Sequence, residues 1–239
     1  MFFKTRQITS PSIKIAVTGI FLLATTAFAE IQKKPLGAVN IDQFTKELQV
    51  VVSDANAMTQ VWWIPAEFWG AAFMRTNPAL AEQAMSQLSD YGILAVVQAD
   101  ITPFAGFVFH DKQNVMQRMT VTFKSYSQKP VAIKPAKELS ESVQMLVNVL
   151  SPMLANTMGE LGKNMHLIVM QNRDDKKKLI VDPYQQGKVV VKLAGSKTTP
   201  ERVTTIEMPV DALYEPRYCP NGKPAHISWQ YCPWSGKKL

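Results

Sequence analysis

The change of hydrophobic period along the chain places the strongest constraint on how it can fold. Apolar and polar residues alternate over 119–126, which is the pattern of a half-buried strand. From Lys137 to about Leu161 the apolar residues recur at three- and four-residue steps, which predicts the longest helix. Pro152 lies within this helix, so we expect a kink or two consecutive helices around Ser151. Turn residues then separate four strand-like runs, at 165–171, 179–181, 188–194 and 203–208.

The part of the chain before residue 119 predicts a series of shorter elements. Asn40 and Asn77 are expected to cap two helices, and Gly92 is expected to end the second of them. The helix that Asn40 caps is expected at 41–49, and further helices at 66–75 and 112–117. Strands are expected at 50–52, 58–64, 93–99, 104–109 and 131–133. Strands on both sides of one long helix indicate an α+β fold rather than alternating βαβ units. We therefore expect antiparallel, β-sandwich-like sheets with a helical hairpin and one long central helix.

The N-terminus has the layout of a secretory signal peptide. Its positive charges come from Lys4, Arg6 and Lys14, and a short apolar run follows at 15–23. Residues 27–29 (Ala-Phe-Ala) form a small-x-small cleavage site, so we expect removal of 1–29 by a cut between Ala29 and Glu30. The alternative, an uncleaved membrane anchor, would need about 20 apolar residues in a row. The expected mature protein is periplasmic or secreted and has no transmembrane segment.

Charge and composition narrow the classes of function. The predicted cleavage removes three basic residues and no acidic one, so the formal net charge falls from +7 to +4. This residual charge is too small to indicate a nucleic-acid partner. Hydrophobic residues make up 46% of the chain, which is enough for a packed core and excludes disorder as the explanation of this sequence. We expect residues 30–216 to form one domain, followed by a distinct tail at 217–239.

The tail contains both cysteines of the chain, each in a Cys-Pro turn that ends in glycine. The first turn runs from Cys219 to Gly222, and the second from Cys232 to Gly236. The tail resembles a C-terminal zinc ribbon, a family in which two Cys-Pro-x-Cys-Gly knuckles supply four thiolates to one zinc ion. The second cysteine of each knuckle is missing here, with Ser235 in its place in the second. The resemblance covers only the tail and implies a cysteine arrangement but no activity.

The resemblance implies that Cys219 and Cys232 lie close together. A structural zinc site needs four ligands, and His226 is the only additional candidate in the tail, so Cys219, Cys232 and His226 make an incomplete set. In an oxidising compartment the two cysteines can form a disulfide instead, which closes a loop of about 14 residues and contributes roughly 3 kcal/mol. A zinc-binding tail that docks a protein partner is the alternative. We expect no bound metal or cofactor and a small disulfide-closed appendix. A redox-active site is disfavoured because the Cys-x-x-Cys spacing is absent.

No complete catalytic motif is present in the sequence. The titratable candidates lack metal-ligand spacing, and there is neither a Gly-x-Ser-x-Gly elbow nor a glycine-rich phosphate loop. We therefore assign no catalytic residue. The candidates that a fold could still bring together are His110, His166, Asp54, Asp100, Asp111 and Glu67.

Three other groups of residues have a structural and a functional interpretation. Trp62, Trp63, Phe68 and Trp69 are a ligand platform or, as we expect, part of the core. The methionines of the long helix (Met145, Met153 and Met158) are a flexible binding groove or, as we expect, core filler. Lys176, Lys177 and Lys178, with Lys188, Lys192 and Lys197, are an anion-binding patch or, as we expect, a solvated turn, because Asp174 and Asp175 are adjacent.

These observations favour an exported, non-catalytic binding or scaffold protein of the cell envelope, whose partner is a protein or an envelope component. The main alternative is a periplasmic hydrolase with a catalytic site assembled from separate loops. A cleft that gathers His110 or His166 with an acid and a nucleophile would favour the enzyme, whereas an apolar surface patch would favour the binding protein.

Overall fold

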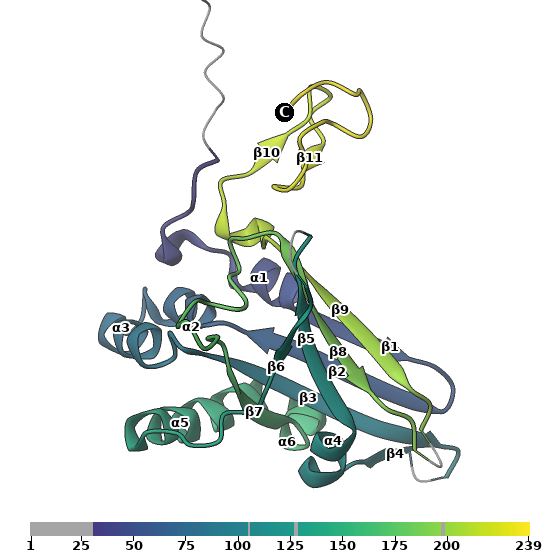
Figure 1. Ribbon diagram of the computed structural model, residues 1–239. Helices are drawn as coiled ribbons and strands as arrows, with labels where there is room; N and C mark the ends of the chain where they lie inside the picture. Colours follow the sequence, from purple (N-terminus) through teal and green to yellow (C-terminus); the bar gives the residue numbers. More distant parts are fainter. Residues whose placement is uncertain (1–30, 105, 127–128, 197–198) are drawn as a thin grey trace, which may run out of the picture. The chain divides into compact units, whose positions relative to one another are not determined.

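Two antiparallel sheets share one hydrophobic core (Figure 1). The computed structural model describes residues 31–104, 106–126, 129–196 and 199–239. The predicted signal peptide therefore lies outside the described residues, as does Lys197. The first sheet contains β1 (Gln49–Ser53), β2 (Ala57–Ile64), β3 (Tyr91–Thr102), β4 (Gly106–Phe109) and β7 (His166–Gln171). The second has the order β6 (Val131–Ile133), β5 (Met119–Lys124), β8 (Gly187–Leu193) and β9 (Arg202–Met208).

Strand β3 organises the first sheet because it is long enough to pair with three neighbours. It pairs with β2 along one edge, where Trp62 faces Ala95. Along the other edge it pairs first with β7, where Val96 faces His166, and then with β4, where Asp100 faces Val108. Every residue of β2 and most of β3 are buried, so both faces of this sheet are covered near its centre.

The second sheet alternates between buried and exposed positions. Val121, Val189 and Ile206 point into the core, while Lys188 and Lys192 lie on the outer face. The apolar residues that alternate along the sequence are therefore the ones that are buried. Strand β9 also contacts β1 and β2, which joins the second sheet to the first.

Helices cover the first sheet, and polar side chains fix where most of them begin. They are α1 (Ile41–Leu48), α2 (Ala66–Phe73), α3 (Pro78–Gln87), α4 (Lys112–Arg118), α5 (Glu141–Thr157) and α6 (Gly159–Lys163). The side chains of Asn40, Asn77 and Asp111 each accept a hydrogen bond from a first-turn N–H, at 2.9, 3.1 and 2.8 Å. Helices α2 and α3 pack together as the expected helical hairpin, and α3 also contacts α5 (Figure 1).

The α+β architecture is confirmed, and three expectations about single elements are wrong. The long helix begins at Glu141 rather than Lys137, because Ser140 accepts the N–H of Val143 and caps it there. The helix continues through Pro152, so it does not divide into two helices around Ser151; the division comes at Gly159, whose φ of 57° is left-handed.

The second and third errors concern a glycine and a predicted strand. Gly92 does not end a helix; it lies in β3, where an added Cβ would come within 2.2 Å of the Trp63 ring. The close approach of an indole, not a turn, therefore requires glycine at this position. The predicted strand at 179–181 is reduced to one isolated bridge between Arg173 and Leu179, because Asn172 takes up the backbone groups of Val181 with its side chain.

The tail follows a short 3-10 helix, η2 (Asp211–Leu213), and contains two short strands, β10 (Arg217–Tyr218) and β11 (Pro224–Ala225). A disulfide joins Cys219 to Cys232 with a Cα–Cα distance of 5.6 Å, which confirms the predicted pairing. The two cysteines and Ala225 are buried in a small cluster of their own, against which Trp229 and Leu239 pack. Within the described part of the chain, no helix is both long and apolar enough to cross a membrane.

Candidate functional site

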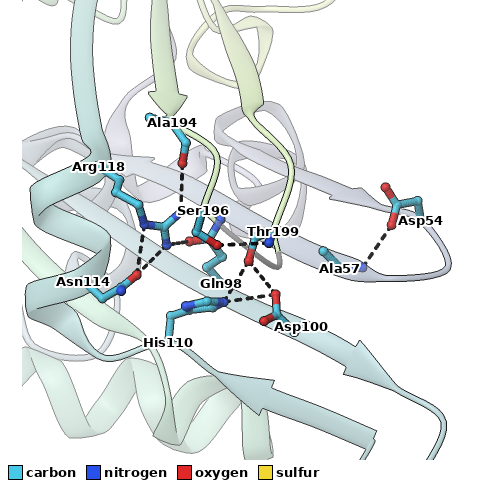
Figure 2. A network of polar contacts seen from close by, with 10 residues as sticks. All are labelled: Asp54, Ala57, Gln98, Asp100, His110, Asn114, Arg118, Ala194, Ser196 and Thr199. Atoms are coloured by element: carbon cyan, nitrogen blue, oxygen red, sulfur yellow. Dashed lines mark hydrogen bonds and ion pairs between the residues drawn. The ribbon is translucent and has the colours of Figure 1, made fainter.

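The fold brings two of the predicted titratable residues, His110 and Asp100, to a threonine (Figure 2). His110 Nε2 lies 3.1 Å from Asp100 Oδ1 and 3.1 Å from Thr199 Oγ1. The hydroxyl of Thr199 in turn donates to Asp100 Oδ1 at 2.5 Å. An acid, a base and a hydroxyl thus meet at the ends of β3 and β4, although the sequence separates Thr199 from Asp100 by 99 residues.

The geometry of this group does not fit nucleophilic catalysis. In a catalytic triad the hydroxyl and the carboxylate bind opposite nitrogens of the imidazole, so that the ring can take the hydroxyl proton. Here both face the same nitrogen, and Thr199 directs its proton to the carboxylate. Thr199 is also only 1% exposed, which leaves no room for a substrate against its oxygen. The group instead fixes Thr199, which precedes β9, to the first sheet.

An arginine extends the same anchoring network (Figure 2). Arg118, at the end of α4, donates to the side chain of Asn114 at 3.0 Å and to the carbonyl of Ala194 at 2.8 Å. It also donates to the side-chain oxygen of Gln98 in β3. One guanidinium thus ties α4, β3 and the end of β8 together, a use of several donors that lysine could not reproduce.

The remaining predicted candidates are dispersed and structural. His166 Nε2 lies 2.7 Å from the carbonyl of His110, and Asp111 caps α4. Asp54 accepts hydrogen bonds from Arg202 and from two backbone N–H groups of the β1–β2 turn. These bonds lower the pKa of Asp54 to about 2, and the bond from Arg202 has the largest effect. Burial raises the pKa of Glu67, at the start of α2.

Glu67 belongs to a polar cluster at the base of α2. Burial, followed by the charge of Glu67, raises the pKa of Tyr184 to about 12. Tyr184 packs edge-on against Tyr214, and the Lys33 ammonium lies 4.0 Å from the centre of its ring. Tyr214 donates its hydroxyl to the Tyr184 carbonyl at 2.9 Å. These contacts hold Tyr214, just before the tail, against Tyr184.

The three candidate zinc ligands of the tail do not form a metal site. Cys219 and Cys232 use both sulfur atoms in the disulfide. His226 Nδ1 lies 2.7 Å from Ser228 Oγ, and its Nε2 faces Asp211 at 3.4 Å. Among the residues that the structure describes, no group of three or more His, Cys, Asp or Glu side chains could hold a metal ion.

Asp211, His226 and Ser228 have the order of a catalytic triad, with the carboxylate and the hydroxyl on opposite ring nitrogens. Two observations favour a structural role. His226 Nδ1 already accepts the backbone N–H of Ser228 at 3.2 Å, so its lone pair is shared. The backbone N–H of Ile227 and that of Trp229 are bonded to Asp211 and to the His226 carbonyl, so neither can stabilise an oxyanion.

An apolar groove of about 440 Å³ lies between α1, α2 and α5 and is the best candidate for a binding site. Its volume falls in the range of ligand pockets. Three of the four aromatic residues singled out in the sequence, Trp62, Phe68 and Trp69, line it, whereas Trp63 does not. Trp62 meets Phe68 edge-to-face at 5.1 Å, and Phe68 meets Trp69 in the same manner at 5.5 Å. All three are buried, as predicted, yet they line the groove as well.

Of the three methionines expected to fill the core, Met158 packs against it, but the expectation is wrong for Met145 and Met153. Met145 is 65% exposed and Met153 is 42% exposed, and Val149 between them is 52% exposed. These three residues, spaced by four, form one apolar stripe along the outer face of the helix. Met153 and Met158 also line the groove, so the stripe continues into it. The inner face of α5 supplies the core through Val143, Leu146, Val147, Leu150 and Leu154.

The lysine-rich turn is a solvated turn, as expected. Asp174 accepts the backbone N–H groups of Lys176 and Lys178, at 2.9 and 2.8 Å, which closes the turn. On the second sheet Lys192 pairs with Glu201 at 2.8 Å. Acidic side chains thus lie beside the described lysines of the second sheet, which disfavours a concentrated anion-binding surface there.

Comparison with protein-family models, with curated proteins and with solved structures returned no match.

Proposed function

We propose that this is an exported, non-catalytic binding protein of the cell envelope that holds an amphipathic helix of a partner protein. The observation that carries the proposal is the apolar surface of α5, which runs from Met145 through Val149 and Met153 into the aromatic groove. Exposed apolar stripes that continue into a pocket are characteristic of interaction sites.

The length and charge of this surface suit a helix. Met145 and Met158 are 13 positions apart, so the surface is about 20 Å long, which corresponds to three to four turns of a partner helix. Between Ser142 and Thr157 helix α5 contains no charged residue. The partner must therefore offer an apolar face, with anchors at helical spacing.

An extended strand is a poorer occupant for a physical reason. The backbone groups of α5 are bonded within the helix, so they cannot pair with those of a strand, whose own N–H and C=O groups would be desolvated without partners. A helix satisfies its backbone internally. Methionines suit such a contact because their unbranched side chains adapt to the shape of the partner.

The proposed location depends on the N-terminal pattern and is supported weakly by the disulfide, which persists in oxidising compartments. Fractionation of cells that make the full chain, with N-terminal sequencing of the product, tests this part. The expected product begins at Glu30 and lies outside the cytoplasm. A cytoplasmic product that retains residues 1–29 would contradict it.

A photo-reactive residue placed at Met153 tests the binding function. Cross-linking in envelope extract should give one dominant protein, and peptide mapping should place the link on the apolar face of a helix. The same probe at Val203, which is 53% exposed on the second sheet, is the control. Equal yields at the two positions, or a link to an extended or highly charged segment, would contradict the proposal. If the cross-link joins a lipid instead of a protein, the occupant of the groove is an acyl chain and not a partner helix.

A further inference from the structure

A second cleft, of about 400 Å³, lies where the tail meets the end of the second sheet. It is separate from the aromatic groove and shares no lining residue with it. Met208 contributes an apolar patch of the wall. The other lining side chains are aromatic or polar: Tyr126, Gln186 and Glu207 from the body, and His226, Ser228 and Trp229 from the tail.

The aromatic wall of the cleft is held in place before any ligand arrives. The backbone N–H of Trp229 donates to the His226 carbonyl at 3.0 Å, and its own carbonyl accepts from Arg217 at 3.2 Å. Its ring meets Trp234 at 5.8 Å with an interplanar angle of 73°. It also packs against the buried disulfide cluster. A ring fixed in this way loses little conformational entropy when a ligand stacks on it.

The polar wall offers both acceptors and donors. The Glu207 side chain is 56% exposed, and its nearest cation, Lys188, stays 3.8 Å away, so the carboxylate oxygens can still accept hydrogen bonds from a ligand. Gln186 is exposed and carries an amide with both donor and acceptor atoms. Both ring nitrogens of His226 already face protein partners, Ser228 and Asp211. His226 therefore gives the wall a ring of fixed orientation.

We propose that this cleft binds the pyranose rings of a glycan. A pyranose has one face of C–H groups, which stacks on an aromatic ring, and a rim of hydroxyls, which need acceptors and donors at its edge. Trp229 and Tyr126 supply the aromatic rings for stacking, and Glu207 and Gln186 supply the hydrogen-bonding groups for the hydroxyls.

Two other ligand classes fit less well. A nucleotide or phosphate is repelled by Glu207 in the wall and by Asp211 behind His226. A purely apolar ligand would desolvate the Glu207 carboxylate without replacing its hydrogen bonds. The inference does not depend on the partner helix of α5, because the two sites share no residue.

Saturation-transfer NMR and calorimetry with four tetrasaccharides test the proposal on the mature chain with its disulfide intact. The probes are the tetramers of β-linked N-acetylglucosamine, β-linked glucose, α-linked glucose and α-linked mannose. At least one should bind, and Trp229→Ala should weaken that binding at least tenfold. Glu207→Gln should weaken it about three- to tenfold.

Tyr231→Ala is the matched control, because Tyr231 is an aromatic residue of the same tail, is 58% exposed and does not line the cleft. It should keep the affinity within about twofold. Near-ultraviolet circular dichroism and the mass of the oxidised protein show whether each variant keeps its folded tail. If none of the four sugars binds the unmodified protein, or if Trp229→Ala and Tyr231→Ala behave alike, the proposal is wrong.

Discussion

The Oδ1 atom of Asp211 accepts a hydrogen bond from the backbone N–H of Ile227 at 2.8 Å, and this contact joins the tail to the body. The same oxygen lies 3.4 Å from His226 Nε2. Asp211 sits in η2, directly after the core residue Val210, whereas Ile227 is the buried side chain that follows β11. A carboxylate on the body thus orders a tail whose own core is very small.

Replacing Asp211 by alanine should loosen the tail. The change removes the acceptor of Ile227, and a hydrogen bond to a charged group contributes roughly 1.5–3 kcal/mol. Trypsin should then cleave after Arg217 at least several times faster than in the unmodified protein, because Arg217 is held by the carbonyls of Ile227 and Trp229. Asp211→Asn keeps an acceptor oxygen and should be cleaved at an intermediate rate. Equal rates in all three proteins would show that the contact does not order the tail.

Reduction of the Cys219–Cys232 disulfide should unfold the tail but not the body. The disulfide accounts for roughly 3 kcal/mol of local stability in the chain-entropy model, and the tail buries few other residues. Thermal melting should show an unchanged main transition, while both thiols become alkylated. Mass spectrometry of the native protein with and without reductant provides the readout. Thiols that alkylate freely before reduction would contradict the disulfide.

Glu67→Gln should raise the free energy of unfolding at pH 7. Burial raises the folded-state pKa of Glu67 above its ordinary value of 4.5, so the folded protein holds this proton more tightly than the unfolded chain. The stabilisation that follows is present below pH 4.5 and is lost as the pH rises through the folded-state pKa. The difference between the variant and the unmodified protein should therefore shrink as the pH falls from 7 towards 4.5.

Urea unfolding at several pH values measures this difference. Glu82→Gln, on the exposed side of α3, is a matched control for the loss of one carboxylate. If the advantage of Glu67→Gln is the same at every pH, burial of the charge is not its cause.

Thr199→Val should destabilise the protein by about 1–3 kcal/mol. Valine has a similar shape but leaves Asp100 Oδ1 without the donor of Thr199 and removes the contact with His110. Thr199→Ser keeps the hydroxyl and should cost less, since only a methyl group is lost. Chemical denaturation gives both values. A valine variant as stable as the serine variant would mean that the hydroxyl does not anchor the chain at Thr199.

The sequence predicted those parts of the fold that depend on local signals. Asn40 and Asn77 cap helices where the pattern placed them, and the alternating apolar residues of β5 are the buried ones. It misplaced Gly92, because the need for glycine there comes from the Trp63 indole across the strand pair, a contact that no local pattern encodes.

The candidate sites were harder to foresee because they depend on tertiary contacts. Met145 and Met153 were expected in the core because of their residue type, but a helix with apolar side chains on two faces can bury only the face that meets the sheet. The approach of Thr199 to His110 spans 89 residues, and the cleft at Trp229 needs the tail and the second sheet together. The sequence shows which residues can form hydrogen bonds, but it does not show which of them the fold brings into contact.

Val149 and Val203 allow the most direct test of the proposed binding surface. Both are valines, 52% and 53% exposed, but Val149 lies in the stripe on α5 and Val203 lies on the second sheet. Once the partner has been identified by cross-linking, calorimetry compares its binding to Val149→Glu and to Val203→Glu. A charge placed in the centre of the stripe should weaken binding at least tenfold, while the control should stay within about twofold. Equal affinities of the two variants would contradict the account.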